Sequence, residues 1–290
     1  MPDHSLPPRS IAVMANPQVG EAYQQAQEVT AALQSHGATV SCGMLNDEDL
    51  RAQVMDGGFD LLIALGGDGT MLRAGHLCAP VQVPILGINM GRFGFLTEVE
   101  LDEWRAALPR LLQGEYRLEK RMMISASQWR NGQRLGDWEV LNEIVVSRGH
   151  LVHPVHLEAS VDGRFLSTFV ADALIAATPT GSTAYALAAG GPILPPELRN
   201  ILLVAVAPHL SIDRAIVLAE GSTVNITVVT DHQAVLSPDG QPPLDLETGD
   251  QITACASEHS ALFVRFQDPG YFYRNLTPHM SQNPSTGNHR

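Results

Sequence analysis

Two short segments of this sequence hold the residue types that bind and transfer phosphate. The first, GGDGT at residues 66–70, follows the apolar run FDLLIAL at residues 59–65. Glycines let the backbone approach a ligand closely and turn N–H groups toward phosphate oxygens. A carboxylate in such a turn repels phosphate, so Asp68 suits the role of a general base or of a Mg²⁺ ligand. The alternative is an ordinary glycine-rich turn in which Asp68 caps a helix.

The second segment is TPTGSTAY at residues 178–185, which lies between an apolar run and a stretch of small residues. Its hydroxyl and N–H groups can bind phosphate or ribose, and Tyr185 can stack on a base. The alternative is a Ser/Thr-rich helix cap with a tyrosine in the core.

A third polar feature, the pair Asn142-Glu143, interrupts a strand-like apolar pattern. An amide and a carboxylate side by side can both bond the vicinal hydroxyls of a ribose. The alternative is a pair on an edge strand that faces water.

The elements that position these segments change in type along the chain. Strands are expected at residues 10–14, 39–42, 59–65 and 83–88, and helices at residues 21–36, 47–55, 70–77 and 101–112. This alternation predicts a parallel sheet in an open α/β layer, which binds ligands outside the carboxyl ends of its strands. From Lys120 onward strand patterns predominate, at residues 122–128, 140–146, 155–161, 165–170, 174–177, 201–206, 223–229, 252–256 and 262–266. That half is expected to be mostly β.

The charge balance excludes several classes of function. With 18 Lys and Arg against 31 Asp and Glu, the net charge of −13 argues against nonspecific binding to nucleic acid or to an anionic membrane. Lys120 is the only lysine and no G-x-x-x-x-G-K-[ST] run surrounds it, so lysine-dependent phosphate loops and Schiff-base sites are close to excluded. The three cysteines lie far apart and indicate neither a disulfide scaffold nor a thiolate metal site.

Length and hydropathy set further bounds. A chain of 290 residues predicts two domains at about 150 residues each. No stretch approaches 18 consecutive apolar residues, and the first ten residues lack the apolar core of a signal peptide, so a cytoplasmic location is expected. His150, His153 and His156 recur at a spacing that does not place them on one face of a strand, so no zinc site is expected.

Taken together, the polar segments resemble the NAD kinase family. The resemblance rests on residues 66–70 (GGDGT), 89–96 (NMGRFGFL), Asn142-Glu143, Asp172, 178–193 (TPTGSTAYALAAGGPI) and 237–241 (SPDGQ). Order and spacing fit from residue 11 to residue 276. Lipid kinases and phosphofructokinases share GGDGT, whereas TPTGSTAY after an Asn-Glu pair is much more specific.

The resemblance implies a Rossmann-like α/β domain followed by a β-rich, β-sandwich-like domain. The α/β domain would comprise residues 1–119, with residues 268–290 packed back on it, and the β-rich, NAD-binding domain residues 120–267. The ligand would lie in the crevice between the two domains.

The resemblance also implies a reaction. The γ-phosphoryl group of ATP would be transferred to the 2′-hydroxyl group of the adenosine ribose of NAD, with Mg²⁺ or another divalent cation, to give NADP. NAD and ATP would be the partners, with no nucleic acid and no membrane. The protein would form a homodimer or homotetramer with sites completed near a subunit interface. Polyphosphate as donor and NADH as acceptor stay open.

Residue roles carry over position by position. Asp68 matches the proposed base, and Asn142 and Glu143 match the pair that holds the adenosine ribose. The other expected substrate contacts are Gly69, His153, Asp172, Thr183, Ala184, Tyr185, Ala186, Leu187, Ala188 and Gln241. The expected phosphate loop comprises Gly66, Gly67 and Thr70, and no metal ligand is assigned.

The sequence departs from the family pattern at three positions. Ala173 stands where many relatives have glycine, Ala188 where many have serine, and Pro238 where a small aliphatic residue precedes the aspartate. These changes put fine substrate preference in question rather than the reaction. Positive charge at the phosphates would come from N–H groups, a metal ion and arginines; Arg73 and Arg92 lie near the loop ends, although an ordinary surface role fits each equally well.

Two other functions compete with this interpretation. A lipid kinase of the diacylglycerol or sphingosine type shares GGDGT and a two-domain plan, but the Asn-Glu pair, TPTGSTAY and the acidic composition argue against it. A catalytically silent nucleotide-binding sensor is the other, and the presence of Asp68 argues against it, because a silent copy could lose the base freely.

Overall fold

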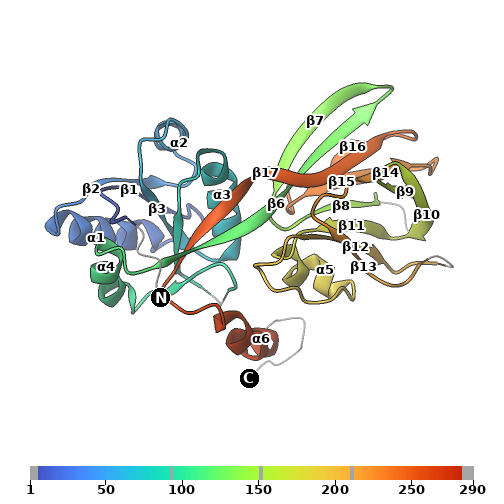
Figure 1. Ribbon diagram of the computed structural model, residues 1–290. Helices are drawn as coiled ribbons and strands as arrows, with labels where there is room; N and C mark the ends of the chain where they lie inside the picture. The colour runs from blue at the N-terminus through green and yellow to red at the C-terminus, as the bar shows by residue number, and fades with distance from the viewer. Residues whose placement is uncertain (1–5, 92–93, 150–152, 210–211, 283–290) are drawn as a thin grey trace. The chain divides into compact units, whose positions relative to one another are not determined.

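The computed structural model of the protein describes residues 6–91, 94–149, 153–209 and 212–282. The chain divides into two compact units, one formed by residues 1–120 and 260–290 and the other by residues 121–259 (Figure 1). The first is an α/β unit and the second a β-rich unit, which confirms the predicted fold class. The domain boundaries predicted from the resemblance stay a prediction.

The α/β unit is a parallel sheet with helices on its faces. Its elements are β1 Ser10–Ala15, α1 Ala22–Ser35, β2 Thr39–Met44, α2 Glu48–Met55, β3 Leu61–Gly66, α3 Asp68–Cys78, a 3₁₀ turn Ala79–Val81, β4 Ile85–Asn89, β5 Val99–Glu100, α4 Trp104–Leu112 and α6 Tyr271–Gln282. The strand order is β2-β1-β3-β4, with the end of β17 and the short β5 also paired to β4. All the registers of this sheet are parallel.

Burial explains why the strands of this sheet are almost uniformly apolar. Every residue of β3 is buried, because helices cover both faces. Helices α1 and α4 pack on one face and share its core with side chains such as Leu33 and Trp104. Helix α3 covers the other face, where Met71 lies so close to Gly87 that an added Cβ atom would come within 2.6 Å of its Sδ.

The β-rich unit consists of antiparallel strands. Its elements are β7 Gln133–Val140, β8 Glu143–Arg148, β9 Val155–Val161, β10 Arg164–Ala171, β11 Ala173–Ala177, a 3₁₀ turn Gly181–Thr183, α5 Tyr185–Ala188, β12 Asn200–Val206, β13 Ile216–Ala219, β14 Val224–Val228, β15 Ala234–Pro238 and β16 Leu244–Leu246. One sheet is six-stranded and has the order β13-β12-β11-β8-β15-β16. The other contains the order β10-β9-β14-β17, in which β14 is the neighbour of β17. Alternate side chains of both sheets form one apolar core.

Two long strands, β6 (Arg117–Arg130) and β17 (Gln251–Arg265), carry the chain from one unit into the other. Two predictions are wrong here. The two strands expected at residues 252–256 and 262–266 are one strand, because the polar residues between them stay in the extended ladder. The strand expected at residues 140–146 is broken at residues 141–142, where β7 ends and β8 begins.

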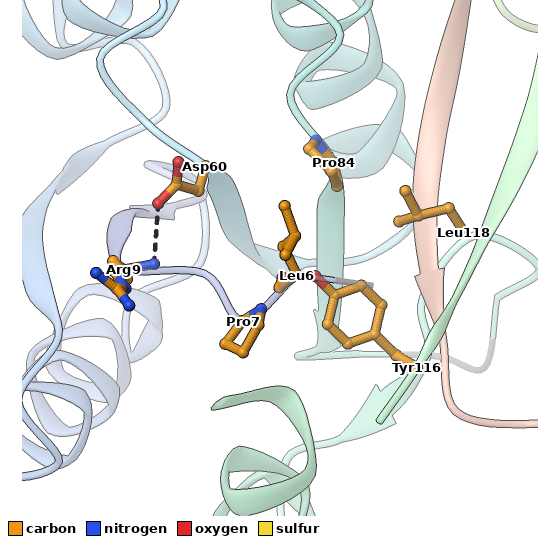
Figure 2. A pocket seen from close by; sticks show the side chains of 7 residues that line it. All are labelled: Leu6, Pro7, Arg9, Asp60, Pro84, Tyr116 and Leu118. Carbon is orange, nitrogen blue, oxygen red and sulfur yellow. Dashed lines mark hydrogen bonds between the residues drawn. The ribbon is translucent and has the colours of Figure 1, made fainter. Parts of the chain in front are cut away.

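A cavity of about 560 Å³ lies in the α/β unit at the amino ends of β1, β3 and β4 (Figure 2). Arg9, Asp60 and Pro84 each precede one of these strands, and Asp60 accepts hydrogen bonds from the N–H groups of Arg9 and Ser10, both at 2.9 Å. The GGDGT loop follows the carboxyl end of β3, at the opposite edge of the sheet. This cavity therefore does not belong to the expected phosphate-binding edge.

Candidate functional site

The GGDGT loop leads directly from β3 into α3. The helix begins at Asp68 rather than at the predicted Thr70, so the carboxylate lies in its first turn. Gly67 and Gly69 border open space, because a Cβ atom added at either would meet no atom within 4 Å. A helix N-terminus with glycines beside open space is suited to bind an anion.

Thr70 holds this loop in place through buried contacts. Its hydroxyl is buried and accepts a hydrogen bond of 2.8 Å from the Asn16 side-chain amide, at the end of β1. Gly66 packs so tightly against Thr70 that an added Cβ atom would lie 2.1 Å from its Oγ1. The contacts of Thr70 hold the loop in place, and its predicted contact with phosphate stays a prediction.

Asp68 does not cap its own helix, so the alternative interpretation of this residue is wrong. The N-cap is Gly67, without a side-chain cap. The carboxylate instead accepts hydrogen bonds from the N–H groups of Phe95, at 2.9 Å, and Leu96, at 3.1 Å. Gly94 completes this cradle, because a Cβ atom there would lie 2.1 Å from Asp68 Oδ1. Each oxygen keeps a second lone pair for a proton or a cation.

The carboxylate oxygens of Asp68 are compatible with a Mg²⁺ ion that binds together with a nucleotide. Among the described residues, no three His, Cys, Asp or Glu side chains are grouped to hold a metal ion. Mg²⁺ commonly binds through one or two carboxylates together with substrate phosphates and water. Asp68 can supply one such carboxylate oxygen. Nearby, Arg73 donates to the carbonyl of Gly69 at 3.3 Å, and Arg92 lies outside the described residues.

Glu143 is the first residue of β8, and Asn142 lies in the turn just before it; β8 lies inside the six-stranded sheet, where it pairs with both β11 and β15. Asp239, in the turn after β15, fixes the backbone before it. One carboxylate oxygen accepts from the N–H of Leu141 at 2.6 Å, and the other from Asn142 at 2.8 Å and Glu143 at 2.9 Å. The alternative of a water-facing edge pair is wrong, because β8 is central and Glu143 is only 7% exposed.

The TPTGSTAY segment packs against the same turn. Thr178 donates through Oγ1 to the carbonyl of Leu141 at 2.6 Å and through its N–H to that of Asn142 at 2.8 Å. Gly181 leaves no room for a side chain, because an added Cβ atom would lie 2.2 Å from the Asn142 carbonyl oxygen. Ser182 is fully buried and bonds the backbone of Pro179 and Leu194. These hydroxyls shape the turn.

The carboxyl group of Glu143 is held in an unusual state by this packing. Burial, followed by the negative charge of Asp239, raises the pKa of Glu143 to about 8, against the lowering effect of the Tyr185 N–H. Among the described residues nothing donates or accepts a hydrogen bond at its buried Oε2. A neutral carboxyl group can both donate and accept a hydrogen bond, so Glu143 can pair with a hydroxyl group of a ligand.

The remaining predicted residues of this segment differ in their exposure to solvent. Tyr185 is 44% exposed, so the alternative of a core tyrosine is wrong. Thr183, Ala184 and Leu187 are half-buried, Ala188 is exposed and Ala186 is fully buried. Gln241 is exposed in the turn after β15, where its carbonyl accepts from the Ser237 hydroxyl at 2.9 Å.

Two predicted residues, Asp172 and His153, do not lie beside the Asn142-Glu143 pair: Asp172 is at the other end of β11, and His153 precedes a strand of the other sheet. Asp172 immediately precedes β11 and pairs with Arg148 at 3.1 Å, whereas Glu143 pairs in register with Ala177 at the far end of that strand. Five residues of strand separate the two ends by roughly 16 Å. His153 precedes β9 beside His232, with ring centroids 6.1 Å apart. Strand β9 meets the Asp172 end, because Val155 pairs with Ala171.

Sequence reasoning missed Asp239 and Thr178 as residues that hold the Asn142-Glu143 pair in place. The SPDGQ segment was recognised, but its aspartate has no assigned role there. A short-range signal was present, because an aspartate in a turn bonds nearby backbone groups. Its actual partners lie about a hundred residues earlier in the chain, which no local pattern indicates.

Comparison with known proteins supplies the observation that decides the family. A family model of the ATP-NAD kinase N-terminal domain matches residues 4–116, and one of the C-terminal domain matches residues 141–266. The NAD kinase of Chloroflexus aggregans is 37% identical over 267 residues, which cover 92% of this chain and 96% of the relative. This chain belongs to the NAD kinase family.

Other members of the NAD kinase family agree in length and fold. The NAD kinase of Symbiobacterium thermophilum is 39% identical over 279 residues, covering 93% of this chain and 98% of the relative. The crystal structure of an NAD kinase from Archaeoglobus fulgidus in complex with ATP matches with a TM-score of 0.74 and 27% identity, over 93% of this chain and 97% of that one. That of yeast NADH kinase complexed with NADH matches with a TM-score of 0.83 and 24% identity, over 98% and 90%, and supports the fold alone.

Proposed function

We propose that the protein transfers the γ-phosphoryl group of ATP to the 2′-hydroxyl group of the adenosine ribose of NAD, giving NADP. Membership of the NAD kinase family supports the reaction class, a phosphotransfer to an alcohol. The observation that supports NAD as the acceptor is the buried Glu143 carboxyl group, whose Oε2 atom has no hydrogen-bond partner among the described residues. A lipid kinase is not favoured, because the family models match both parts of the chain.

In the proposed mechanism, Asn142 and Glu143 bind the vicinal hydroxyls of the adenosine ribose. Asp239 and Thr178 fix the backbone of this pair, so little ordering is needed on binding. Tyr185, half exposed beside the pair, offers an aromatic face to the base.

Asp68 is the proposed general base. A secondary alcohol is a weak nucleophile, and a carboxylate that takes its proton as the new bond forms assists the attack. The N–H groups of Phe95 and Leu96 orient the carboxylate for this transfer. The first turn of α3 and the glycine N–H groups face the phosphates of the donor.

A divalent cation, Mg²⁺ in this proposal, supplies charge neutralisation at the phosphates when it is bound. Because the chain has one lysine among its 18 basic residues, N–H groups and this ion carry much of that task. Asp68 would be its protein ligand, and the donor and water would supply the others.

The protein is further proposed to form a homo-oligomer and to act in the cytoplasm. No helix of the described part is long and apolar enough to cross a membrane. Asp172 lies about 16 Å from the end of β11 that pairs with Glu143. In an oligomer the Asp172 end of one subunit can complete the ligand contacts of another.

Product analysis tests the reaction. Purified protein is incubated with Mg-ATP and NAD, and NADP is read with an NADP-specific dehydrogenase, with diacylglycerol as acceptor in a parallel sample. Phosphorus NMR then locates the new phosphate. We expect it on the 2′ oxygen of the adenosine ribose, and no product from the 2′-deoxy analogue, whose affinity falls by about 1–3 kcal/mol. A phosphate on the 3′ oxygen, on the other ribose or on the lipid would refute the proposal.

A further inference from the structure

The side chain of Arg265, the last residue of β17, is enclosed in the α/β unit by two acids and a tyrosine. It is 1% exposed. Its Nε donates to Glu119 at 3.1 Å and its Nη1 to Glu98 at 3.2 Å. The Tyr271 hydroxyl, on α6, donates to the same Glu119 carboxylate at 3.0 Å. Two carboxylates and a hydroxyl thus fix the orientation of one guanidinium group.

The same guanidinium group binds a segment of the backbone. Its Nη2 donates to the Phe95 carbonyl at 3.2 Å, and its Nη1 to the carbonyls of Leu96 at 3.2 Å and Thr97 at 3.1 Å. A planar fork with five donors can reach three consecutive carbonyls, whereas an ammonium group cannot match this geometry.

The N–H groups of that segment bind Asp68. Those of Phe95 and Leu96 donate to the two oxygens of its carboxylate. Arg265 bonds the carbonyl groups of the same two residues. Hydrogen-bonded groups polarise one another when they are connected in a chain. The backbone of Phe95 and Leu96 therefore connects the Asp68 carboxylate to a guanidinium group that belongs to the C-terminal part of the chain.

We propose that Arg265 is a positioning residue for Asp68: it fixes residues 95–97 so that the N–H groups of Phe95 and Leu96 hold the carboxylate in one orientation. The proposal rests on the proposed role of Asp68 as the base. Burial of three charged groups is costly, and well-packed apolar residues of similar volume would fill the same space at least as stably. The three carbonyl contacts give the arginine a use that apolar packing cannot supply.

The first test replaces Arg265→Lys, which keeps the charge and loses the fork. We expect kcat to fall by about 10–100-fold, because small displacements of a catalytic group have effects of this size. KM for NAD should stay within about 2-fold, because the ribose contacts are untouched. An unchanged kcat would overturn the proposal.

The second test is a double-mutant cycle with Asp68→Asn. If Arg265 acts through the carboxylate, Arg265→Lys should change kcat by less than about 3-fold in the Asp68→Asn background. An equal loss of kcat in both backgrounds would mean a general structural effect and would refute the positioning role while the base assignment stands. Near-normal kcat for Asp68→Asn alone would instead refute the proposed base.

Two further variants serve as a control for the loss of an arginine fork and as a replacement in case Arg265→Lys does not fold. Arg130→Lys removes a similar fork, which binds Asp250 and Glu247 at 2.6–2.8 Å in the β-rich unit, and should lower thermal stability with kcat unchanged. Glu119→Gln leaves Arg265 in place with a weaker anchor. If Arg265→Lys does not fold, Glu119→Gln decides: a fall in kcat that vanishes with Asp68→Asn supports the proposal, and no fall refutes it.

Discussion

At the scale of single residues, the two carboxyl groups with proposed roles have opposite surroundings. Asp68 is half-buried and receives two N–H bonds from a neighbouring segment. Glu143 is buried beside another acid, and burial together with that acid raises its pKa to about 8. The first environment orients a carboxylate, and the second favours a neutral group that can bind hydroxyls. A carboxyl group whose pKa is raised by burial and by a neighbouring acid is typical of a functional site.

Replacing Asp68→Asn removes the proposed base and keeps the side-chain shape. We expect kcat to fall by roughly 10²–10⁴-fold, with NAD affinity measured by calorimetry largely unchanged. The control is Asp60→Asn, because Asp60 also accepts two backbone N–H bonds but lies at the opposite edge of the sheet. Its kcat should match that of the unmodified protein. Near-normal turnover by Asp68→Asn would refute the assignment.

The raised pKa of Glu143 predicts that the stability of the folded protein depends on pH. Its pKa is raised from 4.5 to about 8 in the folded protein, so the folded state binds the proton more tightly than the unfolded state. The folded protein therefore loses stability as pH rises from about 4.5 through about 8. Glu143→Gln should leave the free energy of unfolding similar near pH 4.5 and raise it by about 2–4 kcal/mol at pH 9. Denaturant melts measure this, and a pH-independent difference would contradict it.

At the scale of elements, the Asn142-Glu143 pair is held by three turns that meet at one end of the six-stranded sheet. They follow β7, β11 and β15, and backbone groups of the turn after β7 are hydrogen-bonded to side chains of the other two turns. Arg121, on β6, adds a hydrogen bond of 3.2 Å to the Thr180 hydroxyl. Such a site is rigid because strands position it and because its polar groups are bonded before the ligand binds.

Gly181 is the tightest point of this arrangement. A Cβ atom there would lie 2.2 Å from the Asn142 carbonyl oxygen, so Gly181→Ala must push the two turns apart. We expect a loss of about 1–3 kcal/mol in the free energy of unfolding and a higher KM for NAD. Gly221→Ala is the matched control, because its Cβ atom would meet nothing within 4 Å and should change stability by less than about 0.5 kcal/mol. Equal effects of the two substitutions would contradict this account.

At the scale of the whole molecule, the predicted ligand contacts of the β-rich unit fall into two groups. Asn142, Glu143 and Tyr185 lie at one end of β11, and Asp172 lies at the other. The proposed homo-oligomer would allow the two ends to serve one ligand from different subunits.

Mixed oligomers test this arrangement. Glu143→Ala and Asp172→Ala chains should each have low activity at NAD concentrations below KM. If sites are shared between subunits, co-expression in equal amounts should restore about a quarter of the sites. Half of the chains keep Glu143 and the other half keep Asp172, so a shared site receives both residues in about one case in four. Light scattering of the mixture checks the oligomeric state. A mixture no more active than the average of the two variants would mean that each site belongs to one chain.

The sequence by itself determined the fold class, the family and the segments that bear the chemistry. Strands and helices of the α/β unit follow from local hydrophobic periodicity, and GGDGT and TPTGSTAY are contiguous in the chain. Strands such as β13 and β16 escaped prediction, because they are short and half exposed and show little periodicity.

Only the tertiary structure decided what surrounds these segments. The partners of Asp68 lie 27 and 28 residues away, those of Glu143 near residue 239, and Arg265 binds carbonyls some 170 residues before it. Burial, the raised pKa of Glu143 and the separation of Asp172 from Asn142 depend on strand register and packing. These are properties of contacts between distant residues, whereas sequence patterns report the preferences of neighbouring ones.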